Sequence, residues 1–180
     1  MRTYQVDLDG YKAELPVLKI AEGVSICFFN LHGHSEMTEH CGKALAKRIP
    51  ECDALITAES KGLQLTHVVA RELGQSRYAV ARKSKKLYMQ DGLDITIESS
   101  ITTGKEQHLY LSADDASLIK GKKVVIVDDV ISTGASLKGL EKIVELAGGI
   151  IVGKAFVLAE GNAKDRPDVT YIASIPVLTD

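Results

Sequence analysis

The sequence is poor in several residue types, and these shortages narrow the kinds of protein it can encode. Its 180 residues contain no tryptophan, four prolines and three cysteines. Cys27, Cys41 and Cys52 are odd in number and have no Cys-x-x-Cys spacing, so we expect reduced thiols. A framework of disulfides and a structural zinc site are therefore not expected.

The chain also lacks a charge imbalance and a long apolar run. Its formal net charge is −2, whereas a dedicated nucleic-acid binder usually carries a basic face and a high pI. No apolar stretch approaches the length of a membrane span, and residues 1–10 lack the pattern of a signal peptide. We therefore expect a cytoplasmic protein with no nucleic-acid partner and no membrane partner.

What the chain does have is an alternation of short apolar runs with amphipathic stretches of helical period. This alternation is typical of an α/β fold, a parallel sheet with helices on its faces. A chain of 180 residues can bury a sizeable core, so we expect a single domain over residues 1–180. Five parallel strands are expected at 54–58, 77–82, 124–127, 150–159 and 170–178, and helices at 35–49, 62–73 and 137–146. Ser35 is expected to cap the first helix.

Two regions fall outside this alternation. Residues 94–101 and 107–112 alternate apolar and polar side chains and are joined by a turn at 102–106, a pattern that predicts a hairpin exposed on one side. The first twenty-odd residues are the other outlier. Both regions are expected to lie outside the central sheet.

The most informative segment is 122–137, which reads KKVVIVDDVISTGASL. Its apolar run suits a buried strand that ends at Asp128 and Asp129, and the carboxyl ends of strands are where open α/β sheets bind ligands. A Ser/Thr/Gly loop follows, in which Ser136 is expected to cap the next helix. Amides at a helix start hold a phosphate, while two carboxylates accept bonds from hydroxyls or hold a divalent cation. The segment therefore predicts a site for a phosphorylated sugar.

The stretch VVIVDDVISTGAS resembles the thirteen-residue signature of the type I phosphoribosyltransferases, which bind 5-phosphoribosyl-1-pyrophosphate (PRPP). The resemblance implies a flap at about 84–113 and a small hood built from the N-terminal segment and residues near the C-terminus. It makes Asp128 and Asp129 the catalytic pair and the ligands of Mg²⁺, directly or through water. It assigns the 5′-phosphate to Ile131, Ser132, Thr133, Gly134, Ala135 and Ser136.

Two further loops suit the pyrophosphate leaving group. The turn at 57–62 follows a strand and precedes a helix, so its amides and the Lys61 amine can grip a pyrophosphate. The run at 81–86 carries four cations at the end of the next strand, on the same rim of the sheet. Since members of the resembling family share this basic loop between subunits, a homodimer is expected. The assigned pyrophosphate-binding residues are Glu59, Ser60, Lys61, Arg82, Lys83 and Lys86.

The resemblance points to a purine base. Phe28, Phe29 and Asn30 resemble the segment with which xanthine phosphoribosyltransferases contact their purine, and a ring face can stack on a base. Enzymes that act on 6-oxopurines commonly add a lysine just after the fourth core strand, where this chain reads AEGN, which favours adenine. Lys164 keeps xanthine, hypoxanthine and guanine open. The flap glutamate of the adenine enzymes is missing at 102–104, and Glu106 is a candidate substitute.

Two other interpretations were weighed. His32 and His34 form a His-x-His pair, but no second compact ligand pair stands at a fixed spacing, so a metal site is not favoured there. The second interpretation is a PRPP-sensing purine or pyrimidine regulator, because some domains of this family are repressors or RNA-binding attenuators. A repressor needs an added DNA-binding module, and the chain before Ile20 is too short for one.

Overall fold

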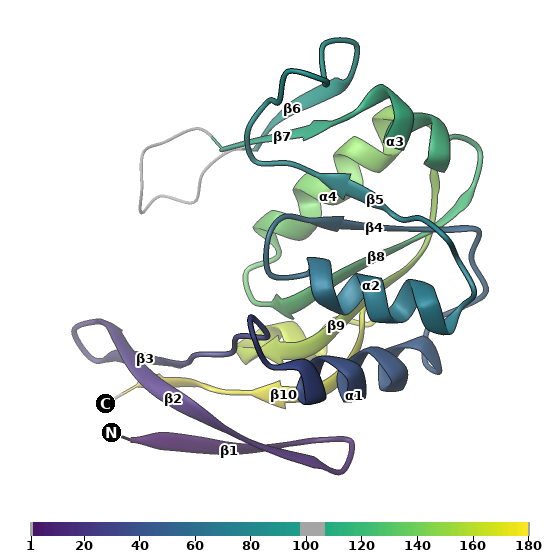
Figure 1. Cartoon of the computed structure of the whole chain (residues 1–180). Coiled ribbons are helices and arrows are strands. Elements are labelled where there is room, and N and C mark those ends of the chain that lie inside the picture. Colours follow the sequence, from purple (N-terminus) through teal and green to yellow (C-terminus); the bar gives the residue numbers. More distant parts are fainter. Residues whose placement is uncertain (1, 98–106, 180) are drawn as a thin grey trace.

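The central sheet lies at the heart of the molecule. A computed structural model describes residues 2–97 and 107–179. Five strands pair in parallel in the order β10-β9-β8-β4-β5, as Figure 1 shows. They are β4 (Ala54–Ala58), β5 (Ala79–Ala81), β8 (Lys123–Ile131), β9 (Ile150–Glu160) and β10 (Thr170–Ile175). The predicted α/β architecture with five parallel strands is confirmed.

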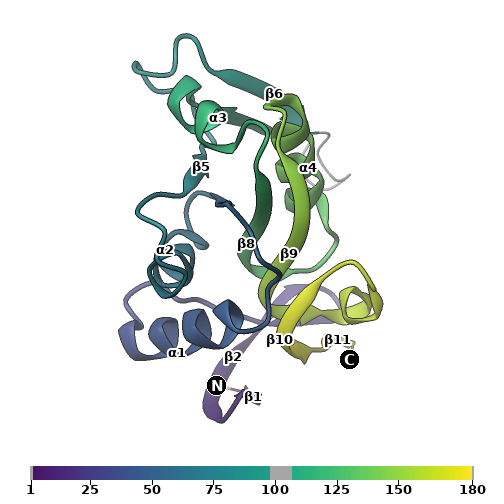
Figure 2. The same cartoon turned by 90° about the vertical axis from the view of Figure 1, so that its right-hand side faces the viewer.

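Helices cover both faces of this sheet (Figures 1 and 2). The helices are α1 (Ser35–Ala46), α2 (Leu63–Glu72), α3 (Ala113–Ile119) and α4 (Ala135–Leu146). The apolar stripes of α1 and α2 belong to one core cluster, and those of α3 and α4 belong to another. Because the sheet is covered on both sides, every residue of β4 is buried. In the described part of the chain, none of the helices is long and apolar enough to cross a membrane.

A second, antiparallel sheet is built from both ends of the chain, and we call it the hood sheet. Its strands run in the order β1 (Thr3–Leu8), β2 (Tyr11–Ala21), β3 (Val24–Cys27) and β11 (Val177–Thr179). The single strand expected at 170–178 is wrong, because the chain leaves the central sheet at Ile175 and enters the hood sheet at Val177. Pro176 stands between the two, and its missing N–H suits a break in pairing.

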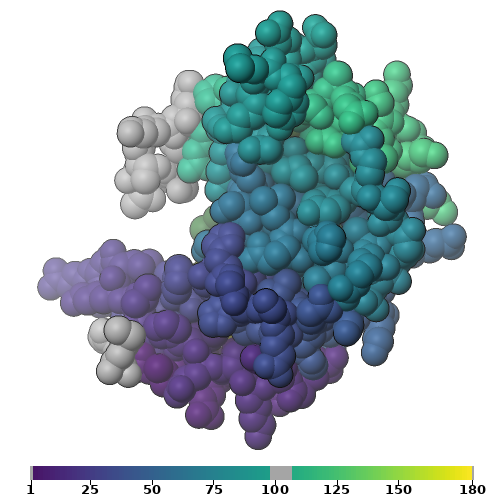
Figure 3. Space-filling model, in the orientation of Figure 1, coloured from purple at the N-terminus to yellow at the C-terminus, as the bar shows by residue number. Residues whose placement is uncertain are grey.

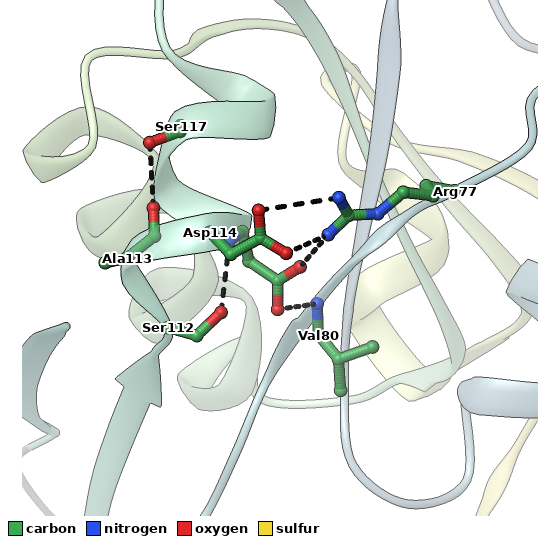
Figure 4. A network of polar contacts seen from close by, with 7 residues as sticks. Arg77, Val80, Ser112, Ala113, Asp114 and Ser117 are labelled. Atoms are coloured by element: carbon green, nitrogen blue, oxygen red, sulfur yellow. Dashed lines mark hydrogen bonds and ion pairs between the residues drawn. The ribbon is translucent and has the colours of Figure 1, made fainter. Parts of the chain in front are cut away.

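The expected hairpin is formed by β6 (Leu93–Ile97) and β7 (Gln107–Leu111), which pair antiparallel. The expected turn at 102–106, with the candidate Glu106, lies outside the described residues. Helix α3, which follows the hairpin, was not expected. It is capped by Ser112, whose Oγ accepts a bond from the Asp115 amide at 3.0 Å. Figure 4 shows Arg77 reaching across to Asp114 (2.6 Å), which ties this helix to the segment before β5.

Several predicted boundaries need correction. Helix α1 ends at Ala46 instead of residue 49, and Pro50 disfavours helical backbone at Ile49. His34 stands at its N-cap position, so Ser35 is the first helical residue and not the cap. Similarly, α4 starts at Ala135 after Gly134, and Ser136 lies inside its first turn. Strand β5 is shorter than predicted, because Arg82 pairs instead with Tyr110 of the hairpin. A 3₁₀ helix, η1 (Gly161–Asp165), follows β9.

Candidate active site

The acidic pair lies within β8 rather than beyond its end. Strand β8 pairs with β9 as far as Ile131, but its pairing with β4 ends at Ile126. The two strands therefore separate along one side of β8 where Asp128 and Asp129 stand. The strand is longer than the sequence predicted, because β9 continues to support it past the aspartates.

The two carboxylates are fixed by the backbone around them. Oδ1 of Asp128 accepts a bond from the Asp129 amide, and Oδ1 of Asp129 accepts one from the Val130 amide, both at 2.9 Å. Burial raises the pKa of Asp128 to about 7, and the charge of Asp129 adds to the rise. Burial also raises the pKa of Asp129, against the lowering effect of Lys61. Such perturbed pKa values mark a candidate site for chemistry.

The loops at 57–62 and 81–86 are called the first and second rim loops. Gly62 brings the first rim loop against the acidic pair. A Cβ on this residue would lie 2.2 Å from Thr57 Oγ1 and 2.9 Å from Asp128 Oδ1, so only glycine fits without displacement. Two buried oxygens of the site lack a hydrogen-bond partner among the described residues, namely Thr57 Oγ1, at this contact, and Asp129 Oδ2, in the acidic pair. Buried polar groups are normally satisfied, so these oxygens indicate a ligand that is bound during function.

The Ser/Thr/Gly loop forms the start of α4, as a phosphate site requires. Gly134 stands at the N-cap position with φ of +82°, a left-handed conformation that favours glycine. Gly134 has no side chain to cap the helix, the Ala135 amide donates to Thr133 Oγ1 over 3.4 Å, and the first turn holds no acidic residue. Ser132 and Thr133 are exposed, whereas Ile131 is buried in the core. The side chain of Ile131 is thus a core anchor, and any phosphate contact from it must come through its backbone.

Glu59, in the first rim loop, holds the start of the second rim loop (residues 81–86) in place. Its carboxylate accepts a bond from Arg82 Nε at 2.7 Å and from the Lys83 amide at 2.6 Å. Burial opposes its ionisation, but the Lys83 amide and the Arg82 guanidinium outweigh that effect and hold the pKa of Glu59 below its usual value. The Glu59 carboxylate therefore positions the second rim loop. If Glu59 binds pyrophosphate, as the sequence predicted, it does so through its backbone.

Two of the cations predicted from the sequence, Lys61 and Lys83, act on the acidic pair. The charge of Lys61 lowers the pKa of Asp129, and the charge of Lys83 lowers that of Asp128. Lys86 donates to Ser84 Oγ at 2.7 Å. Arg82 Nη1 donates to the Tyr88 hydroxyl at 3.1 Å, in addition to its bond with Glu59. Both basic loops thus lie at the edge of the sheet where β8 carries its aspartates.

The segment expected to bind the base joins β3 of the hood sheet to α1, and Figure 3 shows the hood strands in purple, projecting from the body of the molecule. Phe28 is exposed by 36%, and Lys61 Nζ lies 5.1 Å from the centre of its ring. Phe29 is only 3% exposed and packs in the core, so its ring is not free to stack on a base. The Asn30 side chain accepts a bond from the His32 amide at 3.2 Å.

Several residues of the site were missed by the sequence interpretation. Thr57 is the one polar side chain in the buried strand β4, a signal that could have singled it out. His32 contacts Ser60 Oγ at 3.5 Å and the Gln64 amide nitrogen at 3.2 Å, joining the segment before α1 to the first rim loop. Arg166 lies beside Gly134. The His-x-His pattern drew attention to His32 only as a candidate metal ligand, and no local pattern indicated Arg166.

The donor set fits Mg²⁺ better than a transition metal. The described residues contain no group of three or more His, Cys, Asp or Glu side chains able to hold a metal, so the His32–His34 pair is not part of such a cluster. The acidic pair instead offers carboxylate oxygens, including the partnerless Oδ2 of Asp129. Mg²⁺ is typically held by one or two carboxylates together with substrate phosphates.

Together, the acidic pair, the start of α4 and the nearby cations form a site in an α/β protein that suits a phosphorylated, polyanionic ligand. The family profile described as "Phosphoribosyl transferase domain" matches residues 30–177. The chain belongs to this family, which confirms the resemblance expected from the sequence.

Relatives and structures of known proteins agree. The adenine phosphoribosyltransferase of Rhodococcus jostii is 35% identical over 115 residues, which are 64% of this chain and 62% of that protein, less than two thirds of its length. The xanthine phosphoribosyltransferase of Exiguobacterium sp. is 29% identical over 77% of this chain and 75% of that protein. The structure of adenine phosphoribosyltransferase from Thermoanaerobacter pseudethanolicus shares the fold, with 21% identity, a TM-score of 0.73, and coverage of 89% of this chain and 95% of that one.

Proposed function

We propose that the protein is a purine phosphoribosyltransferase that transfers the 5-phosphoribosyl group of PRPP to adenine, giving AMP and pyrophosphate. The observation that carries this proposal is the acidic pair of β8, with the start of α4 following it along the chain and Lys61 and Lys83 of the two rim loops beside it. The family match and the adenine phosphoribosyltransferases among the relatives support the same reaction.

Each half of the site suits one half of PRPP. Ser132, Thr133, Gly134, Ala135 and Ser136 offer hydroxyls and amides to the 5′-phosphate, with the backbone of Ile131 beside them. Asp128 and Asp129 accept bonds from the ribose hydroxyls and hold Mg²⁺, which would neutralise pyrophosphate charge when bound. The pyrophosphate is assigned to the amides of Glu59 and Ser60 and to the side chains of Lys61, Arg82, Lys83 and Lys86, whose charges suit a polyanionic leaving group.

The chemistry follows from positioning and electrostatics, and no covalent enzyme intermediate is needed. A ring nitrogen of the base displaces pyrophosphate from C1 of the ribose, and positive charge develops at that carbon. Ionised Asp128 or Asp129 favours this charge, while the cations of the rim loops stabilise the departing pyrophosphate. The described residues do not supply an assigned proton carrier, because the candidate Glu106 is not among them.

Phe28 is proposed to stack on the base. Its ring is exposed at the junction of the hood sheet and the core, whereas Phe29 is buried. Asn30 is the polar group of this segment and is proposed to help orient the purine.

Xanthine is the second candidate base, and one observation favours it. Lys164 lines a pocket of about 470 Å³ together with Tyr4, Asn162 and Pro176, at the end of β9 and beside the hood sheet. A lysine ammonium there can donate to a 6-oxo group, whereas adenine presents an amino group. The xanthine phosphoribosyltransferase relative supports keeping this alternative, with hypoxanthine and guanine behind it.

A cytoplasmic homodimer is the proposed form of the enzyme, acting as one domain over residues 1–180. Cys27, Cys41 and Cys52 are free thiols, which suits a reducing compartment. Leu87 is 91% exposed and Tyr88 66% exposed, beside the basic loop, and such apolar surface often serves self-association. Sedimentation of the purified protein at two concentrations tests the dimer.

One assay tests the function. The protein is incubated with Mg²⁺, PRPP and, separately, adenine, hypoxanthine, guanine, xanthine, uracil or orotate, and nucleotide and pyrophosphate are measured. We expect AMP and pyrophosphate in equal amounts from adenine. Product from xanthine alone would replace the first candidate by the second. The absence of turnover on every base, with salt-sensitive binding of a nucleic-acid probe, would favour a regulator instead.

A further inference from the structure

Arg166 reaches the start of α4 from a distant part of the chain. It follows η1, and a Cβ on Gly134 would lie 2.8 Å from its Nη1. Ala163 of η1 is buried in the same core cluster as Leu137 of α4, so both elements belong to the core on this side of the sheet. The guanidinium is therefore held against the Ser/Thr/Gly loop at 132–136.

A chain of ion pairs holds this guanidinium. Arg166 Nε and Nη2 donate to the two carboxylate oxygens of Asp168, at 3.0 and 2.7 Å. Asp168 in turn accepts a bond from Lys154 of β9 at 2.8 Å, and Lys154 also pairs with Glu141 of α4. Two elements that flank the loop, α4 and β9, thus fix one edge of the guanidinium. Nη1 makes no hydrogen bond with any described residue.

The electrostatics of this arrangement favour an additional anion. Arg166 and Lys154 are balanced by Asp168 and Glu141, so these four side chains sum to zero charge. The partial positive charge at the start of α4 remains, because no acidic residue stands in its first turn and its side-chain partner, the hydroxyl of Thr133, carries no charge. A guanidinium beside a positive helix end is unfavourable unless an anion is bound between them.

We propose that Arg166 is a binding residue for the 5′-phosphate, donating from Nη1 to a phosphate oxygen held by the loop at 132–136. Asp168 and Lys154 are its positioning residues. This inference rests on the proposed function, which places a phosphate on that loop, and it adds a side-chain cation to a site otherwise made of amides and hydroxyls.

The test is direct binding of ribose 5-phosphate and of pyrophosphate, measured by calorimetry on the parent and on Arg166→Gln. A lost hydrogen bond between charged groups is expected to raise the Kd for ribose 5-phosphate about tenfold or more. The Kd for pyrophosphate, which is assigned to the opposite loops, is expected to change less than twofold. Arg166→Lys keeps the charge without the fork geometry and is expected to lie between the two.

Arg71→Gln is the matched control, since Arg71 also makes a bidentate pair with a carboxylate, that of Glu39, but on the surface of α1 and α2. It is expected to leave both affinities unchanged. Asp168→Asn is expected to weaken ribose 5-phosphate binding a few-fold and to leave pyrophosphate binding unaltered.

The outcomes separate this inference from the proposed function. If the parent binds ribose 5-phosphate and Arg166→Gln binds it equally well, the role of Arg166 is wrong while the function stands. Equal losses for both ligands would also overturn it, because they indicate general damage. If the parent binds neither ligand, both proposals fail.

Discussion

The two halves of the site are built in different ways. The phosphoribosyl half is one continuous segment, in which β8 carries Asp128 and Asp129 and the start of α4 follows within a few residues. The base half is assembled at the hood sheet, where the chain beside Phe28 meets strands from both ends of the protein. In the first half Asp129 is buried and Asp128 is partly buried, whereas the second half presents the exposed ring of Phe28.

This difference in construction implies a difference in tolerance. The acidic pair is buried beside like charge, and a small displacement there changes both charge and geometry. Phe28 makes its contacts at a surface, where a side chain can change with less effect on the fold. We therefore expect substitutions in the phosphoribosyl half to affect turnover strongly, and those in the base half to affect base affinity.

The largest effect is expected from Asp129→Asn. The substitution keeps the Oδ1 that accepts the Val130 amide but removes the charge. Removing one electrostatic group from a transition-state site typically lowers kcat by about 10²- to 10³-fold. Turnover of PRPP and adenine is the measurement, with circular dichroism to verify folding. Turnover within a few-fold of the parent would remove Asp129 from the mechanism.

Gly62→Ala should have the next largest effect. The added Cβ would meet Thr57 Oγ1 at 2.2 Å and Asp128 Oδ1 at 2.9 Å, so the first rim loop must move away from β8. Overpacking of this kind costs about 1–3 kcal/mol in stability. Misplacement of substrate-binding groups is expected to lower kcat/KM for PRPP at least about tenfold.

Gly74→Ala is the control that separates the loss of stability from the loss of kcat/KM. Gly74 has φ of +69° and open space around it, so its substitution strains the backbone without touching the site. It should lower the Tm and leave kcat/KM close to that of the parent. A similar kcat/KM for both alanine variants would contradict the assigned contact between Gly62 and the acidic pair.

The acidic pair also predicts that the protein becomes less stable as the pH rises. Burial raises the pKa of Asp128 to about 7, so the folded protein retains a proton that the unfolded chain releases near pH 4. The free energy of unfolding should therefore fall as pH rises from about 4 to 7. One pKa unit corresponds to about 1.4 kcal/mol. Because the two carboxyl groups titrate as a coupled pair, we expect the free energy of unfolding to fall by a total on the order of 2 kcal/mol.

Urea unfolding at pH 5, 6, 7 and 8 without Mg²⁺ measures this dependence. Asp128→Asn should flatten it and should be more stable than the parent at pH 8, although inactive. Asp168→Asn is the control, because its ion pairs with Arg166 and Lys154 hold the pKa of Asp168 well below this range. It should leave the slope unchanged. If the free energy of unfolding of the parent protein is constant from pH 5 to 8, folding does not raise the pKa of the acidic pair, and this prediction is wrong.

A part of the site could be predicted from the sequence when its residues lie close together along the chain. The acidic pair and its loop lie within one short segment, so the apolar run and the residues after it sufficed to locate them. Arg166 meets Gly134 only because β9 and η1 carry the chain back to the start of α4. That contact is a property of the packed fold and has no local signature.

Other differences between the structure and the sequence prediction have causes in neighbouring residues. Ser112 and Asp115 form the cap of α3, a signal present in the sequence that the hairpin pattern obscured. Pro176 moves the chain from one sheet to the other, although the apolar pattern continues across it. Phe28 and Phe29 are adjacent and chemically alike, and only the position of the chain after β3 decides which ring is buried.

The smallest effect is expected in the base half, from Phe28→Leu. Leucine keeps an apolar surface but removes the ring face, and aromatic stacking beyond area burial is worth about 0.5–1.5 kcal/mol. The KM for adenine should therefore rise about three- to tenfold, while the KM for PRPP and the Tm stay close to those of the parent. Ile20→Leu, at an exposed position of the hood sheet, is the control and should change neither KM. A rise in the KM for PRPP equal to that for adenine would mean that Phe28 acts through Lys61, which lies over its ring, rather than on the base.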